Sequence, residues 1–165
     1  MHRRMGYIMN KDSIQAYSKR IAQANRSELV VITYEIIIEN IKIAQESFLD
    51  KQEFAGALEK AQNFLKELMV SLDFEYKISY ELMSLYIFVN KMLIESKQKD
   101  SIENLPRIQK IMEDLLSSFQ EVSRQDNSAP LMQNAQKVYA GLTYGRNDVN
   151  ETAFVGNEEN RGFRA

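Results

Sequence analysis

The chain has 165 residues, of which 44% are hydrophobic, and its formal net charge is −2 at pH 7. This is enough for one domain with a packed core, and the slightly negative charge argues against nucleic acid as the main partner. The absence of cysteine excludes disulfides, thiolate metal sites and cysteine nucleophiles. Because two prolines and six glycines leave few helix breakers, we expect an all-α protein.

Neither end of the sequence nor its interior has the pattern of a membrane segment. No apolar run approaches the roughly 18 residues that a membrane span needs. The basic start, MHRRMGYIM, lacks the apolar region of about 7–15 residues that a secretory signal contains. We therefore expect a cytoplasmic protein without membrane insertion.

Residues 1–26 are expected to form a polar, basic N-terminal arm. They contain six basic residues against Asp12 alone, a charge of +5, so the rest of the chain carries −7. Two interpretations follow from this asymmetry: the arm is solvated, or it lies back on the acidic body of the protein.

Residues 27–125 are predicted to form an antiparallel four-helix bundle. Ser27 is the expected N-cap of the first helix, and Pro106 lies in the first turn of the last, where its missing N–H costs nothing. The predicted helices cover approximately residues 28–49, 52–72, 77–97 and 104–124. Their connections are short, which places neighbouring helices antiparallel.

The helices differ in how much of their surface is apolar. The second and fourth each have one apolar stripe and a polar back, which is typical of the outer walls of a bundle. The stripe of the fourth helix consists of Leu105, Ile108, Ile111, Met112, Leu115, Leu116, Phe119 and Val122. In the first helix, apolar residues cover most of the circumference, including Val31, Ile38 and Leu49, so we expect it to be nearly surrounded.

The third helix has two apolar stripes on opposite sides. The stripe expected to close the core consists of Ile78, Leu82, Leu85, Tyr86, Val89, Met92 and Leu93. The second stripe consists of Tyr80, Met83, Ile87 and Ile94, with Tyr76 just before the helix. Burying one such side chain is worth about 1.5–3 kcal/mol. Either the arm or tail covers this second stripe, or a partner binds there, and we predict that these five residues bind a client.

Residues 126–165 are predicted to be a weakly structured C-terminal tail. The tail begins with a linker composition, contains four of the six glycines and has few aliphatic residues. The chain also lacks the usual residues of an active site. His2 is the only histidine, no Glu-x-x-His pair exists for a metal centre, and no Gly-Lys-Ser/Thr phosphate loop is present. We therefore expect no catalytic residues, cofactor or metal, and no enzymatic activity.

Four stretches resemble the FliS family of flagellin export chaperones. They are AYSKRI at 16–21, SELVVITYEIIIENIKIA at 27–44, ALEKAQNFLKELMVSLDFEYKIS at 57–79 and LMSLYIFVNKMLIES at 82–96. Their order and spacing match over about 110 residues. The most specific pieces are SLD at 71–73 and LY at 85–86 followed by KMLIES. The chain departs from the family pattern at Asn25-Arg26, where members usually have Ser/Thr-Pro.

The resemblance implies a helical bundle that binds the disordered C-terminal segment of flagellin and holds it unpolymerised before export. The family's N-terminal tyrosine matches Tyr17, and the apolar residue after it matches Ile21. In the family this segment lies over part of the client surface, so we expect Tyr17 and Ile21 to form a removable cover. Components of the export gate are considered as further partners. The alternative is a self-associating structural bundle, or an adaptor with a partner other than flagellin.

Overall fold

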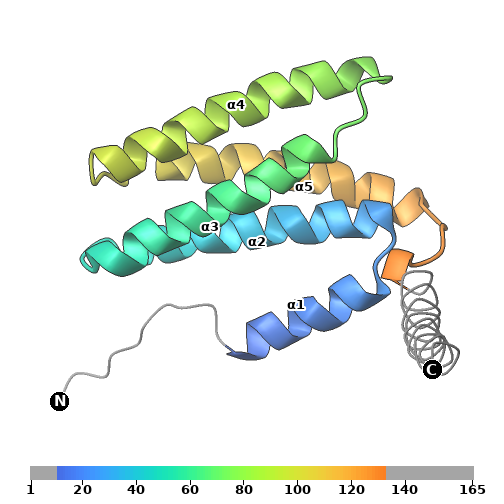
Figure 1. Ribbon diagram of the computed structural model, residues 1–165, viewed down its shortest axis with the longest axis horizontal. Helices are drawn as coiled ribbons and strands as arrows, with labels where there is room; N and C mark the ends of the chain where they lie inside the picture. The colour runs from blue at the N-terminus through green and yellow to red at the C-terminus, as the bar shows by residue number, and fades with distance from the viewer. Residues whose placement is uncertain (1–10, 133–165) are drawn as a thin grey trace, which may run out of the picture.

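The computed structural model describes residues 11–132, which contain five α-helices and no strand (Figure 1). The helices are α1 (Lys11–Gln23), α2 (Arg26–Glu46), α3 (Lys51–Val70), α4 (Lys77–Gln98) and α5 (Leu105–Gln125). The all-α prediction is confirmed within this range. The predicted tail lies mostly outside the described residues. None of the five helices is long and apolar enough to cross a membrane.

Residues 11–23, which are part of the predicted arm, form a helix, α1. This stretch has no proline or glycine, Asp12 lies in its first turn and Arg20 in its last, which suits the helix dipole. Tyr17 and Ile21 are four residues apart and therefore share one face. The described part of the chain thus has five helices rather than four helices preceded by an arm.

The start of α2 also differs from the prediction, because Asn25 and not Ser27 is its N-cap. The Glu28 N–H donates to the Asn25 side chain over 2.9 Å, and the Asn25 N–H donates to the Glu28 carboxylate over 3.0 Å. This reciprocal pair is a capping box, which needs Glu or Gln three residues after the cap. Asn25 has Glu28 at that position, whereas Ser27 has Val30.

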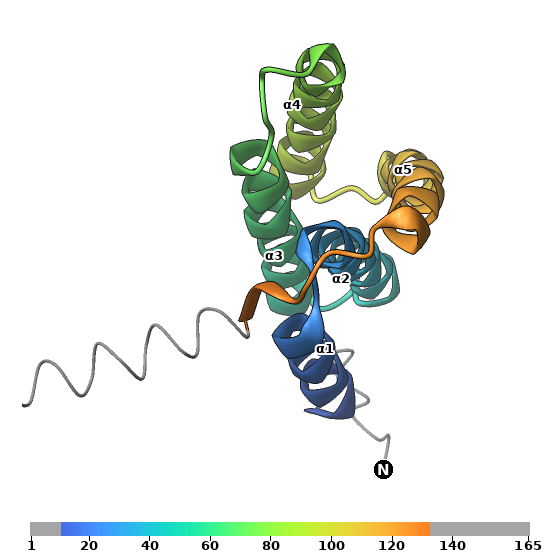
Figure 2. The ribbon, with the colours of Figure 1, turned by 90° about the vertical axis from the view of Figure 1, so that its right-hand side faces the viewer.

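The helices α2 to α5 run alternately up and down, and α2 is the central one (Figures 1 and 2). α2 packs along α3 and α5, while α4 rests on α3 and α5, and α1 lies against the outer side of α2. The largest fully buried side chains come from all four of these inner helices: Tyr34, Ile37, Ile41, Phe54, Leu58, Leu65, Tyr86, Val89, Leu93, Leu105, Ile108 and Met112. Val31 and Ile38 are buried as predicted. Leu49 is 94% exposed, because α2 ends at Glu46 and Leu49 lies in the turn that follows.

α4 has the two faces predicted for it, with one correction. Tyr86, Val89, Met92 and Leu93 are buried in the core. Ile78, which was predicted to be a core residue, is mostly exposed. The first turn of α4 instead turns Ser79 inward, where its hydroxyl donates to the carbonyl of Asp73. The N-terminal end of α4 therefore leaves an apolar side chain at the surface.

Candidate functional site

The five residues predicted to bind a client lie along one outer face of α4, and we call them the outer stripe. Tyr76 is 65% exposed, Tyr80 60%, Ile87 50% and Ile94 37%, whereas Met83 is half-buried. From Tyr76 to Ile94 the stripe extends about 27 Å at 1.5 Å per residue. Phe74 lengthens it at the α3–α4 turn, since its ring lies 5.1 Å from that of Tyr80. The structure thus leaves most of this predicted apolar surface open.

A groove that the sequence did not predict lies beside the outer stripe, and we call it the α4–α5 groove. Its volume is about 480 Å³, and it is formed where α3 ends, α4 begins and α5 passes below them. It is lined by Val30, Leu68, Ser71, Leu72, Asp73, Tyr76, Ile78, Ser79, Leu82, Tyr86, Leu115, Ser118, Phe119 and Val122. Tyr76 belongs to both surfaces, so the outer stripe continues into this groove.

The floor of the α4–α5 groove is rigidly packed. The hydroxyls of Tyr34 and Tyr86 form a buried hydrogen bond with each other. The ring of Phe119 stacks on Tyr34 with the ring centroids 5.3 Å apart. Burial raises the pKa of both tyrosines above its usual value, so both stay neutral. The two tyrosine hydroxyls therefore satisfy each other beneath the groove. The surface of the groove above them is mainly apolar.

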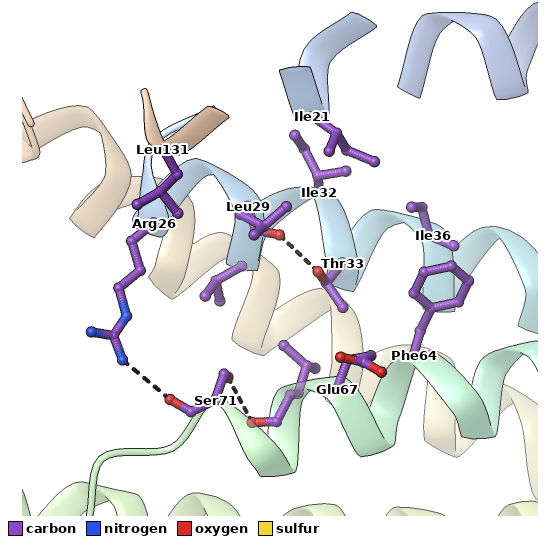
Figure 3. Close-up of a pocket in the computed structure, with 12 residues that line it drawn as sticks. Ile21, Arg26, Leu29, Ile32, Thr33, Ile36, Phe64, Glu67, Ser71 and Leu131 are labelled. Atoms are coloured by element: carbon purple, nitrogen blue, oxygen red, sulfur yellow. Dashed lines mark hydrogen bonds between the residues drawn. The ribbon is translucent and has the colours of Figure 1, made fainter. Parts of the chain in front are cut away.

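A second groove is lined mainly by α2 and α3, and we call it the α2–α3 groove (Figure 3). Its volume is about 730 Å³. Its lining consists of Ile21, Arg26, Leu29, Val30, Ile32, Thr33, Ile36, Phe64, Glu67, Leu68, Ser71 and Leu131. Ile21 comes from α1 and Leu131 from the segment after α5, so two distant parts of the chain reach this groove. The Arg26 guanidinium closes one end of it by donating to the Ser71 carbonyl over 3.4 Å.

The two grooves lie next to each other at the end of the molecule where α2 begins and α3 ends. Both are lined by Val30, Leu68 and Ser71. Between them, the two groove linings extend from the side of α1, across the start of α2, to the start of α4 and the end of α5. This combined lining is largely apolar. The four inner helices all contribute to it.

α1 lies over one edge of the α2–α3 groove and carries Tyr17 and Ile21, the two residues predicted to form a cover. Both side chains are half-buried against a small cluster of Ala24, Ile32, Ile36 and Phe64. No residue of α1 is fully buried. Burial raises the pKa of Tyr17 well above its usual value, and so does the Glu39 carboxylate, which accepts a hydrogen bond from the Tyr17 hydroxyl. Because only two half-buried side chains of α1 contact this cluster, α1 buries little apolar surface against α2.

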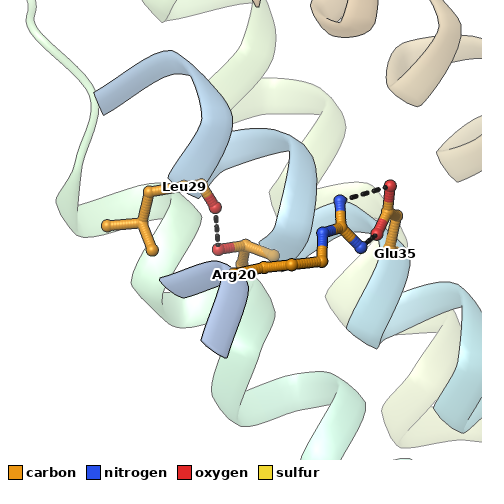
Figure 4. Close-up of polar contacts among 4 residues, drawn as sticks. Arg20, Leu29 and Glu35 are labelled. Carbon is orange, nitrogen blue, oxygen red and sulfur yellow. Dashed lines mark hydrogen bonds and ion pairs between the residues drawn. The ribbon is translucent and has the colours of Figure 1, made fainter. Parts of the chain in front are cut away.

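Polar contacts add to this apolar seat. The Arg20 guanidinium donates through both terminal nitrogens to the two carboxylate oxygens of Glu35 (Figure 4). The same guanidinium lies 5.8 Å from the ring centroid of Tyr17. Because both partners are partly exposed, such an ion pair is worth about 0–1 kcal/mol. The described part of the basic segment thus contacts the acidic body through Arg20, in line with one of the two interpretations of its charge.

Sequence reasoning found the outer stripe and the seat of α1 but missed both grooves. One sequence feature pointed to the α4–α5 groove. The apolar stripe predicted for α5 continues to Val122, whereas the buried residues of α5 end at Met112. Val122, at the end of that stripe, is 55% exposed and lines the groove. No comparable signal pointed to the α2–α3 groove, whose lining comes from α1, α2, α3 and the segment after α5.

A comparison with known protein families gives one match. The family described as flagellar protein FliS matches residues 9–126, which include all five helices. No curated protein matches the chain. The family match ends at Asp126, so residues 127–132 are described by the structure but lie outside the match.

Proposed function

The chain belongs to the FliS family of flagellar proteins, and on that premise we propose that it is a cytoplasmic chaperone for flagellin. Its client is the disordered C-terminal segment of flagellin, which it holds as a monomer until export. The observation that carries this proposal is the apolar surface formed by the two neighbouring grooves and the exposed outer stripe.

The physical basis of binding is burial of apolar side chains from a client that has no fold of its own. Ordering a disordered segment costs about 2–5 kcal/mol or more. Since one large apolar side chain returns about 1.5–3 kcal/mol on burial, several anchors along an extended surface are needed. An amphipathic helix with apolar residues at positions i, i+3, i+4 and i+7 fits a groove between helices. The two grooves and the outer stripe together offer room for more than one such segment.

Prevention of polymerisation follows from the same contacts. The apolar face that a flagellin segment buries in the chaperone is unavailable for contacts with other flagellin subunits. The client is then released at the export machinery, whose components are the further partners in this proposal.

In this account α1 is a removable cover for the α2–α3 groove. Its apolar seat is half-buried and its ion pair with Glu35 is partly exposed, so displacing α1 costs little compared with opening the core. A client that extends into the α2–α3 groove competes with Tyr17 and Ile21 for the same apolar surface.

The test is a calorimetric titration with a synthetic peptide of the flagellin C-terminal segment. Val122→Asp places a charge at the rim of the α4–α5 groove without touching the buried core, and we expect it to weaken binding at least tenfold. Val70→Asp is the matched control, because Val70 is 84% exposed on α3 and lines neither groove. Equal affinity of the two variants for the peptide would contradict binding in the groove.

The second candidate function is self-association through the outer stripe, favoured by its exposed apolar side chains. Sedimentation of the isolated chain separates the two functions. A monomer that binds the flagellin peptide supports the chaperone. The chaperone proposal would be overturned if the chain forms a stable oligomer that does not bind the peptide and that dissociates when Ile87→Asp is introduced.

A further inference from the structure

The segment that follows α5 returns to the corner between α1 and α2 (Figures 1 and 2). We call residues 126–131 the strap. The Leu131 N–H donates to the carbonyl of Ala24 over 3.1 Å. The side-chain amide of Asn25 donates to the carbonyls of Asp126 and Ser128, over 3.3 and 3.4 Å. The Ser27 hydroxyl donates to the Asp126 carboxylate.

These contacts fall on the hinge of α1. Only Ala24 and Asn25 separate α1 from α2, and both are buried. Movement of α1 away from α2 requires rotation at these two residues, because each helix is internally hydrogen-bonded. The strap binds the carbonyl of one and the side chain of the other. Asn25 also caps α2, so its side chain is fixed in the position that the strap needs.

The far end of the strap reaches the groove that α1 covers. Leu131 lines the α2–α3 groove together with Ile21 of α1, and Figure 3 shows it above Arg26 at the rim. Hydrogen bonds from the Ser128 and Ser27 side chains lower the pKa of Asp126 to about 2, so its carboxylate accepts both bonds at neutral pH. The strap therefore touches the cover, its hinge and the covered surface.

We propose that residues 126–131 hold α1 closed over the α2–α3 groove, so that the C-terminal segment of this chain controls how readily the groove opens. In this arrangement Ile21 and Leu131 form part of the groove's wall and limit access to it until both move away. The strap lies almost wholly beyond the residues that match the family. The proposed function determines only which partner enters the opened groove. The closure itself depends on contacts within this chain and not on any partner.

The test uses a single reactive thiol as a reporter of opening. The chain has no cysteine, so Ile32→Cys introduces one thiol at a position buried under Ile21. The rate at which a thiol reagent modifies this cysteine in the full chain measures how often α1 lifts. A second reporter, Ile37→Cys, lies in the core away from α1 and measures global unfolding.

The strap is weakened by Ser27→Ala with Asp126→Ala, which removes both partners of their side-chain hydrogen bond and leaves the strap's backbone contacts in place. The matched control is Ser117→Ala with Asp114→Ala, which makes the same two changes at exposed positions of α5. We expect the strap variant to raise the modification rate at residue 32 roughly tenfold or more, in line with the net strength of a lost hydrogen bond to a charged group. The control should leave this rate unchanged, and the rate at residue 37 should not change in either variant.

Equal rates at residue 32 in the strap variant and the control would overturn the proposal. So would a parallel rise at residue 37, because the strap would then stabilise the whole fold and not the cover. The assay contains no partner, so its outcome is independent of flagellin. If the strap variant opens the groove and the flagellin peptide binds to neither form, the proposed function fails and the strap stands.

Discussion

α1 and α2 are consecutive helices joined by two residues, yet they are held in the molecule in different ways. α2 has nine buried residues, from Val31 to Ala44, and is enclosed by α3 and α5. α1 has no buried residue and rests on α2 through two half-buried side chains and an ion pair. The difference separates two structural roles: α2 is a central part of the buried core, whereas α1 is attached to its surface. Our proposal that α1 exchanges with a client depends on this weaker attachment.

The largest expected effect is on stability, from a substitution in the enclosed helix α2. Ile37→Ala removes a fully buried side chain of α2 and should lower the free energy of unfolding by about 2–5 kcal/mol, through lost burial and the cavity that remains. Ile21→Ala on α1 should lower it by about 1 kcal/mol or less, because that side chain is half-buried. Urea denaturation followed by circular dichroism measures both. Similar losses for the two variants would show that α1 is part of the cooperative core.

The next effect concerns client binding at the outer stripe. Ile87→Asp with Ile94→Asp should weaken binding of the flagellin peptide at least tenfold, because unpaired charges would be buried against the client. The same double variant should lose only about 1 kcal/mol of stability, on the scale of surface substitutions. Leu49→Asp is the control, as it is highly exposed in the α2–α3 turn. If peptide affinity is unchanged in a double variant that melts normally, the client lies in the grooves alone.

A smaller effect should come from loosening α1. Ile21→Asp places a charge in the apolar seat and should release the cover, so that peptide binding becomes roughly twofold to tenfold tighter while the core stays folded. Ile14→Asp makes the same change at an exposed position of α1 outside the seat. Calorimetric titration of both variants gives the comparison. Weaker binding by Ile21→Asp would mean that α1 contacts the client and does not cover its site.

The smallest effect belongs to the ion pair between Arg20 and Glu35. A double-mutant cycle with Arg20→Gln and Glu35→Gln should give a coupling free energy of about 0.2–1 kcal/mol for closure of α1. The coupling should fall as the salt concentration rises, since both partners are partly exposed to solvent. Thiol modification of Ile32→Cys at low and high salt measures it. A coupling that is large and insensitive to salt would make the ion pair the main attachment of α1.

Much of the fold follows from patterns within single helices. The burial of α2 and the two faces of α4 were predicted correctly because each depends on the order of residues in one segment. α1 was missed as a helix because its composition is polar and its partners, Ile32, Ile36 and Phe64, lie elsewhere in the chain. Ile78 was misplaced because its exposure depends on how the first turn of α4 meets the preceding loop.

The grooves and the strap were not predictable from the sequence for a related reason. The α4–α5 groove exists because α4 rests on α3 and α5 while its first turns stand off from the others, and no local pattern encodes that arrangement. The bond between Ser27 and Asp126 joins residues 99 positions apart. Sequence periodicity reports which face of a helix is apolar, and it does not report which other segment, if any, covers that face.

Hydrogen exchange of the full chain with and without the flagellin peptide tests the central claim most directly. We predict that bound peptide slows amide exchange at residues 68–82 and 115–122, which form the α4–α5 groove, and speeds exchange across α1 as the cover is displaced. Saturating peptide that leaves exchange unchanged in both regions would contradict the account.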